Sequence, residues 1–328
     1  MRKFSIPFTW HGEVDEFIDF VKANKAHIDS VYFSLPHILN TNSHFTAIRK
    51  SQVNSQHQLD YRDLKTLEFV VKSLGVVKRM ATINSVSYYA PIEEYEKTIK
   101  QLVIPFLQLY KIETVIITHF FVGKWIKEAL PEIEIQTSCN DFQFLLPQME
   151  IWKKELGVEV FNPPRETGRT PGLFTSFKQA GYKLKVMIND ACLYGCPYHV
   201  AHAAVNEIHS FEKFHPEGED CLFGQTENFF RGNWLLPRWL PLIDEYVEVY
   251  KIVGRGFPLE DVKKIVTAYI NLDDSLPINE LLGATGVNYR FHDKKVPCSR
   301  IPDKLLTCQR LECDPCGICT NLTKEFLV

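Results

Sequence analysis

The sequence predicts an α/β fold: a (β/α)8 barrel of the TIM type with a Cys-rich C-terminal extension. Three observations lead to this prediction. Eight short runs are rich in β-branched and aromatic residues, a helical pattern separates successive runs, and five of the nine cysteines follow residue 282. Regular alternation of strand and helix implies parallel strands with right-handed crossovers, and eight such units close naturally into a barrel. An open, doubly wound sheet is the second choice.

The expected strands are short, and the segments between them have helical periodicity. The helical pattern is clearest over 14–21 and 262–269, where apolar residues recur at i, i+3, i+4 and i+7. In chain order, the expected strands are 4–8, 30–35, 79–84, 114–119, 134–139, 158–162, 184–189 and 248–253.

Two connections, 36–58 and 190–245, are longer than plain crossovers need, and long loops inside compact domains are usually functional. After Leu282 the alternation ends. We therefore expect a barrel over 1–282 and a metal-binding tail over 283–328. The tail is too short to bury a core of its own, so it is expected to pack on the barrel and to be fixed by metal.

The composition excludes several classes of protein. The chain is 45% hydrophobic and 23% charged, as in ordinary globular proteins, and its net charge of -3 gives no bulk attraction to nucleic acid. The apolar run near the N-terminus is too short for a secretory signal, and no run approaches the ~18 residues of a membrane span. A cytoplasmic protein is expected. In that reducing compartment, nine cysteines indicate metal or redox chemistry rather than disulfides.

The tail holds the strongest chemical signal. Cys308, Cys313, Cys316 and Cys319 follow a CxxxxCxxCxxC pattern, whose thiolates suit an iron–sulfur cluster or, alternatively, tetrahedral zinc. Reduced cysteines without metal are a further alternative. Cys192 and Cys196 directly follow the seventh strand, at the face where barrel enzymes place their sites, and Cys221 lies in the same connection.

Polar residues at the ends of two other strands, the sixth and the eighth, indicate a binding site at this face. Arginine presents a planar fork that suits carboxylate or phosphate, so an anionic substrate is expected. The alternative for the arginines is an ion pair with Glu166 or Asp190. The candidate substrate-binding residues are Asn162, Arg165, Arg169, Lys251 and Arg255.

Two further polar residues are candidates for catalysis. His119 ends the fourth strand and Asn140 follows the fifth, where a proton-transfer or hydrogen-bonding group is expected. For His119, a hydrogen-bonded core histidine is the alternative. The sequence contains no GxSxG, HExxH, GxxxxGK[ST] or GxGxxG motif, so serine hydrolase, zincin, P-loop and dinucleotide-binding functions have no local support.

Several segments resemble the U32 peptidase, or collagenase-like protease, family. They are DSVYFSL at 29–35, IQTSCN at 135–140, VFNPPRETGR at 160–169, the Cys-bearing segment after the seventh strand and YKIVGR at 250–255. The resemblance covers most of 1–282. It implies a barrel with a four-cysteine [4Fe-4S] cluster, and several branches of the family act in oxygen-independent hydroxylation of ubiquinone precursors or RNA bases rather than as proteases.

The sequence departs from the protease branch of that family. The signature of that branch has a longer gap between its two cysteines and continues into Ser-Gly, whereas this chain has Cys192-Leu-Tyr-Gly-Cys196-Pro. It is more similar to the small, single-barrel branches. The resemblance implies Cys192, Cys196 and Cys221 as three cluster ligands, with the fourth supplied by the tail or by Cys139. A second cluster held wholly by the tail is also open.

Three hypotheses about function follow. The first is an iron–sulfur enzyme for oxygen-independent hydroxylation or a related modification of an anionic or aromatic substrate, either a small molecule or an RNA base. The second is a peptidase of the U32 family. The third is a non-catalytic subunit whose metal staples the tail while the barrel binds another protein, because some similar hydroxylation proteins form heterodimers.

Overall fold

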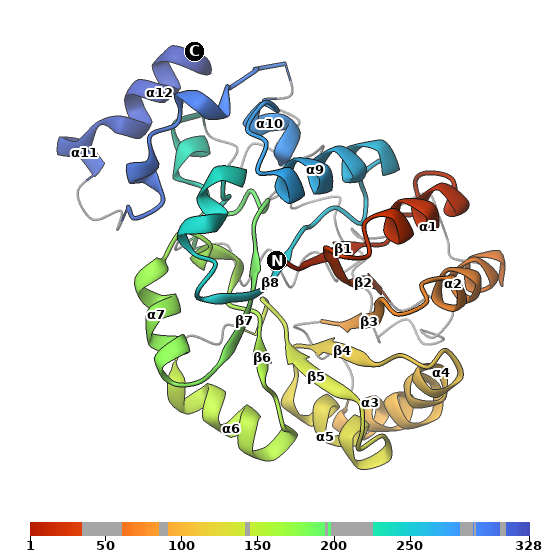
Figure 1. Ribbon diagram of the computed structural model, residues 1–328. Helices are drawn as coiled ribbons and strands as arrows, with labels where there is room; N and C mark the ends of the chain where they lie inside the picture. The colour runs from red at the N-terminus through yellow and green to blue at the C-terminus, as the bar shows by residue number, and fades with distance from the viewer. Residues whose placement is uncertain are drawn as a thin grey trace.

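The computed structural model describes residues 1–34, 61–84, 91–141, 145–193, 196–197, 226–282, 291, 293–308 and 313–328. Eight parallel strands form one sheet in the order β5-β4-β3-β2-β1-β8-β7-β6, and this sheet curves into a nearly closed barrel (Figure 1). Pairing of β1 with β8 confirms the barrel and excludes the open sheet. The predicted fold class is therefore confirmed.

All eight predicted strands are present, with ends that shift by a few residues. For example, β2 begins at Ile28 because Ile28 pairs with Phe4 of β1. The strands are β1 Phe4–Pro7, β2 Ile28–Ser34, β3 Lys78–Ile83, β4 Thr114–Ile117, β5 Glu134–Thr137, β6 Val160–Phe161, β7 Lys183–Met187 and β8 Val247–Lys251.

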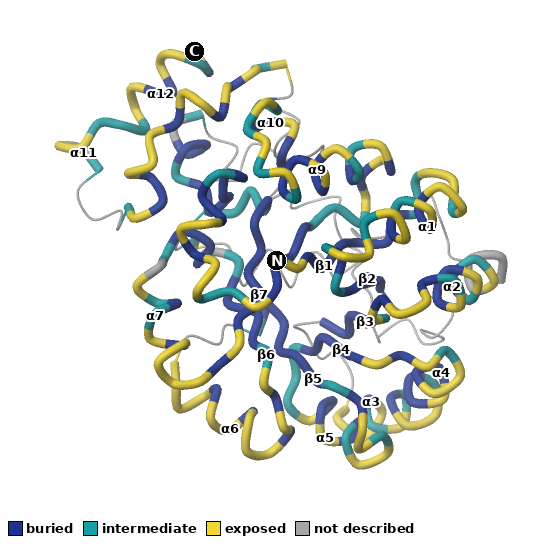
Figure 2. Tube along the Cα trace, viewed as in Figure 1, coloured by how far each residue is buried: buried dark blue, intermediate teal, exposed yellow. Residues whose placement is uncertain are grey.

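The barrel helices surround the strands and expose their outer faces (Figure 2). Each buries one apolar stripe, as α1 does with Phe17, Ile18 and Val21. The helices around the barrel are α1 Val14–Ala23, α2 Tyr61–Ser73, α3 Ile92–Thr98, α4 Ile104–Leu109, α5 Phe120–Ala129, α6 Leu146–Leu156, α7 Pro171–Gln179 and α9 Leu259–Asn271. Over the described ranges, no helix is both long and apolar enough to cross a bilayer.

The interior of the barrel is unusually polar. Barrel interiors are normally filled by branched apolar side chains. Here Ser30 Oγ donates to Ser5 Oγ at 2.8 Å, and Lys185 Nζ lies 3.2 Å from Met80 Sδ on the far side of the barrel. Lys185 is fully buried, and burial is the main cause that lowers its pKa to about 7. The repulsion of Lys251 lowers this pKa further. The core therefore contains a lysine whose charged form is disfavoured.

The junction between β5 and β6 is closed by a side chain instead of a strand ladder. Asn162 is fully buried, its backbone N–H donates to Thr137 Oγ1 at 3.1 Å, and its Nδ2 donates to the Thr137 carbonyl at 2.6 Å. One of these bonds leaves from the side-chain amide and the other from the backbone N–H, so two bonds between backbone and side chain replace the ladder, and Asn162 Oδ1 accepts none from the described residues. Asn162 thus holds the barrel closed.

The described part of the tail packs on the barrel. It contains short 3-10 turns at Cys298–Arg300 and Asp303–Leu305, followed by α11 Cys313–Cys316 and α12 Ile318–Phe326, while α10 Ile278–Leu281 precedes it. Val296, Ile301 and Leu305 are buried in the same apolar core as the barrel helices. This shared core accords with a tail packed on the barrel, and the boundary at residue 282 stays a prediction.

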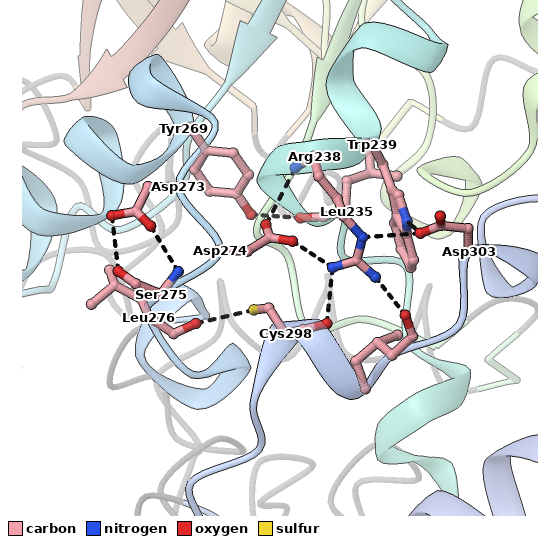
Figure 3. A network of polar contacts seen from close by, with 11 residues as sticks. Leu235, Arg238, Trp239, Tyr269, Asp273, Asp274, Ser275, Leu276, Cys298 and Asp303 are labelled. Atoms are coloured by element: carbon pink, nitrogen blue, oxygen red, sulfur yellow. Dashed lines mark hydrogen bonds and ion pairs between the residues drawn. The ribbon is translucent and has the colours of Figure 1, made fainter.

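One arginine connects the barrel to the tail (Figure 3). Arg238, in the 3-10 turn Pro237–Leu242, forms ion pairs with Asp274 after α9 and with Asp303 in the tail. Its guanidinium also donates to the carbonyls of Cys298, at 2.9 Å, and Ile301. Trp239 Nε1 donates to Asp303 Oδ1 at 2.6 Å. The five N–H groups of a guanidinium suit this multiple attachment.

Candidate active site at the barrel mouth

The carboxyl ends of β2, β3 and β8 bring two cations together. Lys251 is the last residue of β8, and Arg255 follows it in the connection to α9. Arg255 Nη1 donates to Ser34 Oγ at the end of β2 and to Thr82 Oγ1 of β3 at 2.7 Å. The structure therefore places Arg255 over the mouth of the barrel.

Gly254 shapes the connection between these two cations. Its φ of +139° lies in a region that side chains rarely adopt, and a Cβ there would lie 2.4 Å from Phe257 Cδ2. Glycine is therefore required between Lys251 and Arg255 for the chain to turn toward α9.

Tyr32 lies beneath both cations. Lys251 Nζ is 4.8 Å from the centroid of its ring, and the Arg255 guanidinium carbon is 5.4 Å away. Cations are attracted to the negative face of an aromatic ring. Burial is the main cause that lowers the pKa of Lys251 to about 8, and Arg255 and Arg165 lower it further. Burial is also the main cause that lowers the pKa of Arg255 to about 10.

Arg165 approaches the same mouth from the turn after β6. Its Nε lies 3.6 Å from Asp190 Oδ2, and its Nη2 lies 3.5 Å from Asn140 Oδ1, the limit of a hydrogen bond. Asn140 is almost fully buried, and its Nδ2 meets no hydrogen-bond acceptor among the residues described. Among the described residues, three cations and an amide donor thus lie at this mouth with the carboxylate of Asp190. This excess of positive charge suits an anionic ligand.

The structure separates two of the expected substrate-binding residues from this group. The amide of Asn162 closes the β5–β6 junction. Arg169 is buried elsewhere: its guanidinium lies 4.9 Å from the ring centroid of Trp234 and donates to the Phe230 carbonyl at 3.0 Å. The five candidates therefore divide into a mouth group of Arg165, Lys251 and Arg255, a junction residue, and an arginine that faces the tail.

The sequence interpretation missed the strand side chains that complete the mouth group. Ser30, Tyr32 and Ser34 alternate along β2, and this period of two places them on the inner face of the barrel. The same alternation places the side chain of Lys185, on β7, inside the barrel. Polar residues at alternate positions in otherwise apolar strands were the available signal.

His119 lies directly before α5, at the carboxyl end of β4, as expected. Burial lowers its pKa to about 4, so its imidazole is neutral near pH 7. A neutral imidazole can accept a proton or donate a hydrogen bond, and it adds no charge to the cationic mouth.

We expect His119 to remain neutral across the physiological range. In a nuclear magnetic resonance titration, its ring signals should not shift between pH 5.5 and 8, because burial opposes protonation. The His119→Gln variant assigns the signals by their disappearance. A midpoint above pH 6 at His119 would contradict this electrostatic assignment.

Cys192 after β7 and helix α12 of the tail both contact one shared segment, residues 226–233. The Cys192 carbonyl accepts from Asn233 N–H at 2.9 Å and from Asn233 Nδ2 at 3.1 Å. From the other side, α12 packs on the 3-10 turn Thr226–Arg231, where Thr323 Oγ1 lies 3.4 Å from the Thr226 carbonyl. The barrel loop and the tail therefore meet across this segment. Cys221 lies outside the described residues.

The tail cysteines neighbour one another and two arginines. Burial is the main cause that raises the pKa of Cys319. The nearby thiols of Cys308 and Cys313 raise this pKa further, whereas Arg169 and Arg231 act to lower it. Soft sulfur donors beside cations suit an iron–sulfur cluster or zinc. Within the described ranges, no group of three or more His, Cys, Asp or Glu side chains is placed to hold a metal ion. The donor chemistry fits the expected metal, and the ligand set stays a prediction.

Comparisons with known proteins give similarity both in sequence and in fold. No family model matches the chain. The chain is 26% identical over 156 residues to a Methanocaldococcus jannaschii protein named an uncharacterized protease. The match covers 44% of this chain and 46% of that relative, so the chain spans about half of its length. The solved U32 peptidase Mk0906 shares the fold with a TM-score of 0.53 at 10% identity, over 79% of this chain and 94% of that chain. The chain is thus similar in sequence to that relative and similar in fold to a solved U32 peptidase.

Proposed function

We propose that this chain is an iron–sulfur protein that modifies an anionic or aromatic substrate, a small molecule or an RNA base, at the barrel mouth. Oxygen-independent hydroxylation is the reaction class that the family resemblance favours. The observation that carries the proposal is the group of Arg165, beside Asp190, and of Lys251 and Arg255, over Tyr32, on the same face as the Cys-bearing connection after β7.

Each part of the mouth has a defined task in this proposal. Arg165 and Arg255 bind the negative group of the substrate, and Tyr32 orients the cations. The Nδ2 of Asn140 is a buried donor for a substrate oxygen, and neutral His119 is the candidate proton acceptor. A bound [4Fe-4S] cluster would supply electron transfer, and Cys192, Cys196, Cys221 and the tail cysteines would hold it, as one cluster or two.

Cluster assembly is tested with anaerobically purified protein. We expect brown protein containing iron and acid-labile sulfide, and we expect Cys192→Ala and Cys313→Ala to lose most of both, because each removes a proposed thiolate. The measurements are absorption and electron paramagnetic resonance spectra, with iron, sulfide and zinc per chain. Colourless protein with one zinc and no sulfide would favour the metal-stapled subunit instead.

Cys298→Ser is the matched control. The Cys298 thiol is fully buried, donates to the Leu276 carbonyl at 3.0 Å, and has its pKa raised to about 12 by burial above all. A protonated, buried thiol is inert, so this variant should retain its iron. Loss of iron from Cys298→Ser to the same extent as from Cys313→Ala would contradict the ligand assignment.

A peptidase is the second candidate function. It is favoured by the name of the Methanocaldococcus jannaschii relative. The discriminating observation is cleavage of unstructured peptides by protein from which iron has been removed. Cleavage that survives iron removal and is lost in His119→Gln would support a peptidase and overturn the iron-dependent reaction.

A further inference from the structure

We propose that Lys251 is a nucleophilic amine that forms an imine with a small carbonyl compound, whose carboxylate or phosphate is held by Arg165 and Arg255. This inference rests on the anion-binding part of the proposed function and is independent of the iron–sulfur cluster. It assigns a chemical class to the substrate: an aldehyde or ketone that also carries an oxyanion.

The surroundings of Lys251 increase the share of the neutral amine, which is the nucleophilic form, although Cys139 and Asp190 act in the opposite direction. The residue is only 5% exposed, its Nζ shares the Tyr32 ring with Arg255, and Arg165 is a further cation nearby. Removal from water and adjacent positive charge both disfavour an ammonium ion. At the carboxyl end of β8, the amine lies at the face where barrel enzymes perform their chemistry.

Arg255 is arranged to hold an oxyanion next to this amine. Its recorded hydrogen bonds to described residues both leave from Nη1, toward Ser34 and Thr82. The Nε and Nη2 edge of the guanidinium therefore remains for a bidentate contact. Asp190 Oδ2 lies 3.6 Å from Arg165 Nε and is a single carboxylate beside that cation.

The proposed step is balanced without an oxidant or reductant. The Nζ lone pair attacks the carbonyl carbon, and a carbon–nitrogen bond forms. The carbonyl oxygen leaves as water with two protons, one or both of which come from the amine. The product is a neutral imine, or an iminium ion after uptake of one further proton.

The second buried lysine provides a comparison. Lys185 is fully enclosed in the barrel, with its Nζ on the thioether of Met80. It lies in the middle of β7, whereas Lys251 ends β8. A substrate at the mouth therefore reaches Lys251 and not Lys185.

The experiment traps the imine in the full-length protein. Pyridoxal 5′-phosphate and, separately, pyruvate are added with sodium cyanoborohydride, and the adduct is located by intact mass and peptide mapping. We expect one rapidly formed adduct on Lys251, and labelling at least tenfold slower in Lys251→Met and Lys251→Arg. The arginine variant keeps the positive charge, so it separates loss of the amine from loss of folding. Lys185→Met should label as the wild type does.

Two further arms separate the amine from the anion site. Pyridoxal, which lacks the phosphate, should label Lys251 at least tenfold more slowly than pyridoxal 5′-phosphate, and Arg255→Gln should remove this difference. Labelling spread over surface lysines, or unchanged in Lys251→Met, overturns the proposal. If inorganic phosphate or acetate binds at the mouth but neither carbonyl compound forms an adduct, the imine is overturned and the anion site of the proposed function stays intact. Equally fast labelling of Lys251 by pyridoxal and by pyridoxal 5′-phosphate overturns the anion site.

Discussion

Lys185→Met should stabilise the protein by about 3–5 kcal/mol at pH 6, an unusually large gain for one substitution. Lys185 is fully buried and its ammonium faces a thioether, a weak acceptor. Burial is the main cause that lowers its pKa from 10.5 to about 7. The folded protein therefore bears the cost of a buried charge or of deprotonating it, and methionine removes this cost.

The gain should depend on pH in a defined direction. Between pH 7 and 10.5 the unfolded chain keeps its proton on Lys185 while the folded chain has lost it, so the stability of the wild type rises with pH across this window. Below pH 7 the cost is fully present. The advantage of Lys185→Met should therefore be greatest at pH 6 and small at pH 10. Denaturant unfolding at several pH values measures it.

Lys183→Met is the control on the same strand. Lys183 is exposed and pairs with the exposed Glu159 at 3.1 Å. Exposed ion pairs contribute little, so this variant should change stability slightly at any pH. If Lys185→Met gives the same small, pH-independent change, the buried-charge interpretation is wrong.

Arg238→Ala should loosen the tail from the barrel, with a loss of about 2–4 kcal/mol in local stability. The change leaves Asp274 and Asp303 without their shared cation and removes two hydrogen bonds to tail carbonyls. Hydrogen exchange should accelerate over 293–308 and α12, while the strands of the barrel exchange as before. Limited proteolysis should cut the tail first.

Two other arginine variants set the scale for this effect. Arg238→Lys keeps the charge but loses the planar fork, so it should recover part of the protection. Arg300→Ala removes an exposed pair with Glu325 in the same tail and should leave exchange unchanged. Equal exchange in Arg238→Ala and Arg300→Ala would show that apolar packing, and not Arg238, holds the tail.

The fold was predictable because each strand is a short apolar run, although every strand ends one or two residues before its predicted end. Buried parallel strands require continuous apolar sequence on the helix-facing side, as in the Val115 and Ile117 pair of β4. The ends were less certain, since pairing such as that of Phe4 with Ile28 involves residues far apart in sequence.

The site was predictable in its location but not in its composition. The rule that barrel sites lie at the carboxyl ends of strands correctly placed Lys251, Arg255 and Arg165 on one face. It gave no means to tell Arg165 from Arg169, four residues later, which turns away to stack on Trp234. Gly168 permits that turn, because a Cβ there would lie 2.4 Å from the Asn233 carbonyl oxygen. Such contacts depend on the packing of distant segments, which no local pattern records.

The closure of the barrel by Asn162 has a mechanical consequence. Separating two paired strands elsewhere in the barrel breaks several backbone hydrogen bonds, whereas separating β5 from β6 breaks chiefly the two hydrogen bonds between Asn162 and Thr137. Asn140 follows β5 on one side of this junction, and Arg165 follows β6 on the other side. The mouth of the barrel therefore widens at the lowest free-energy cost at this junction. Any such widening changes the distance between Asn140 and Arg165, the two groups proposed to bind the substrate.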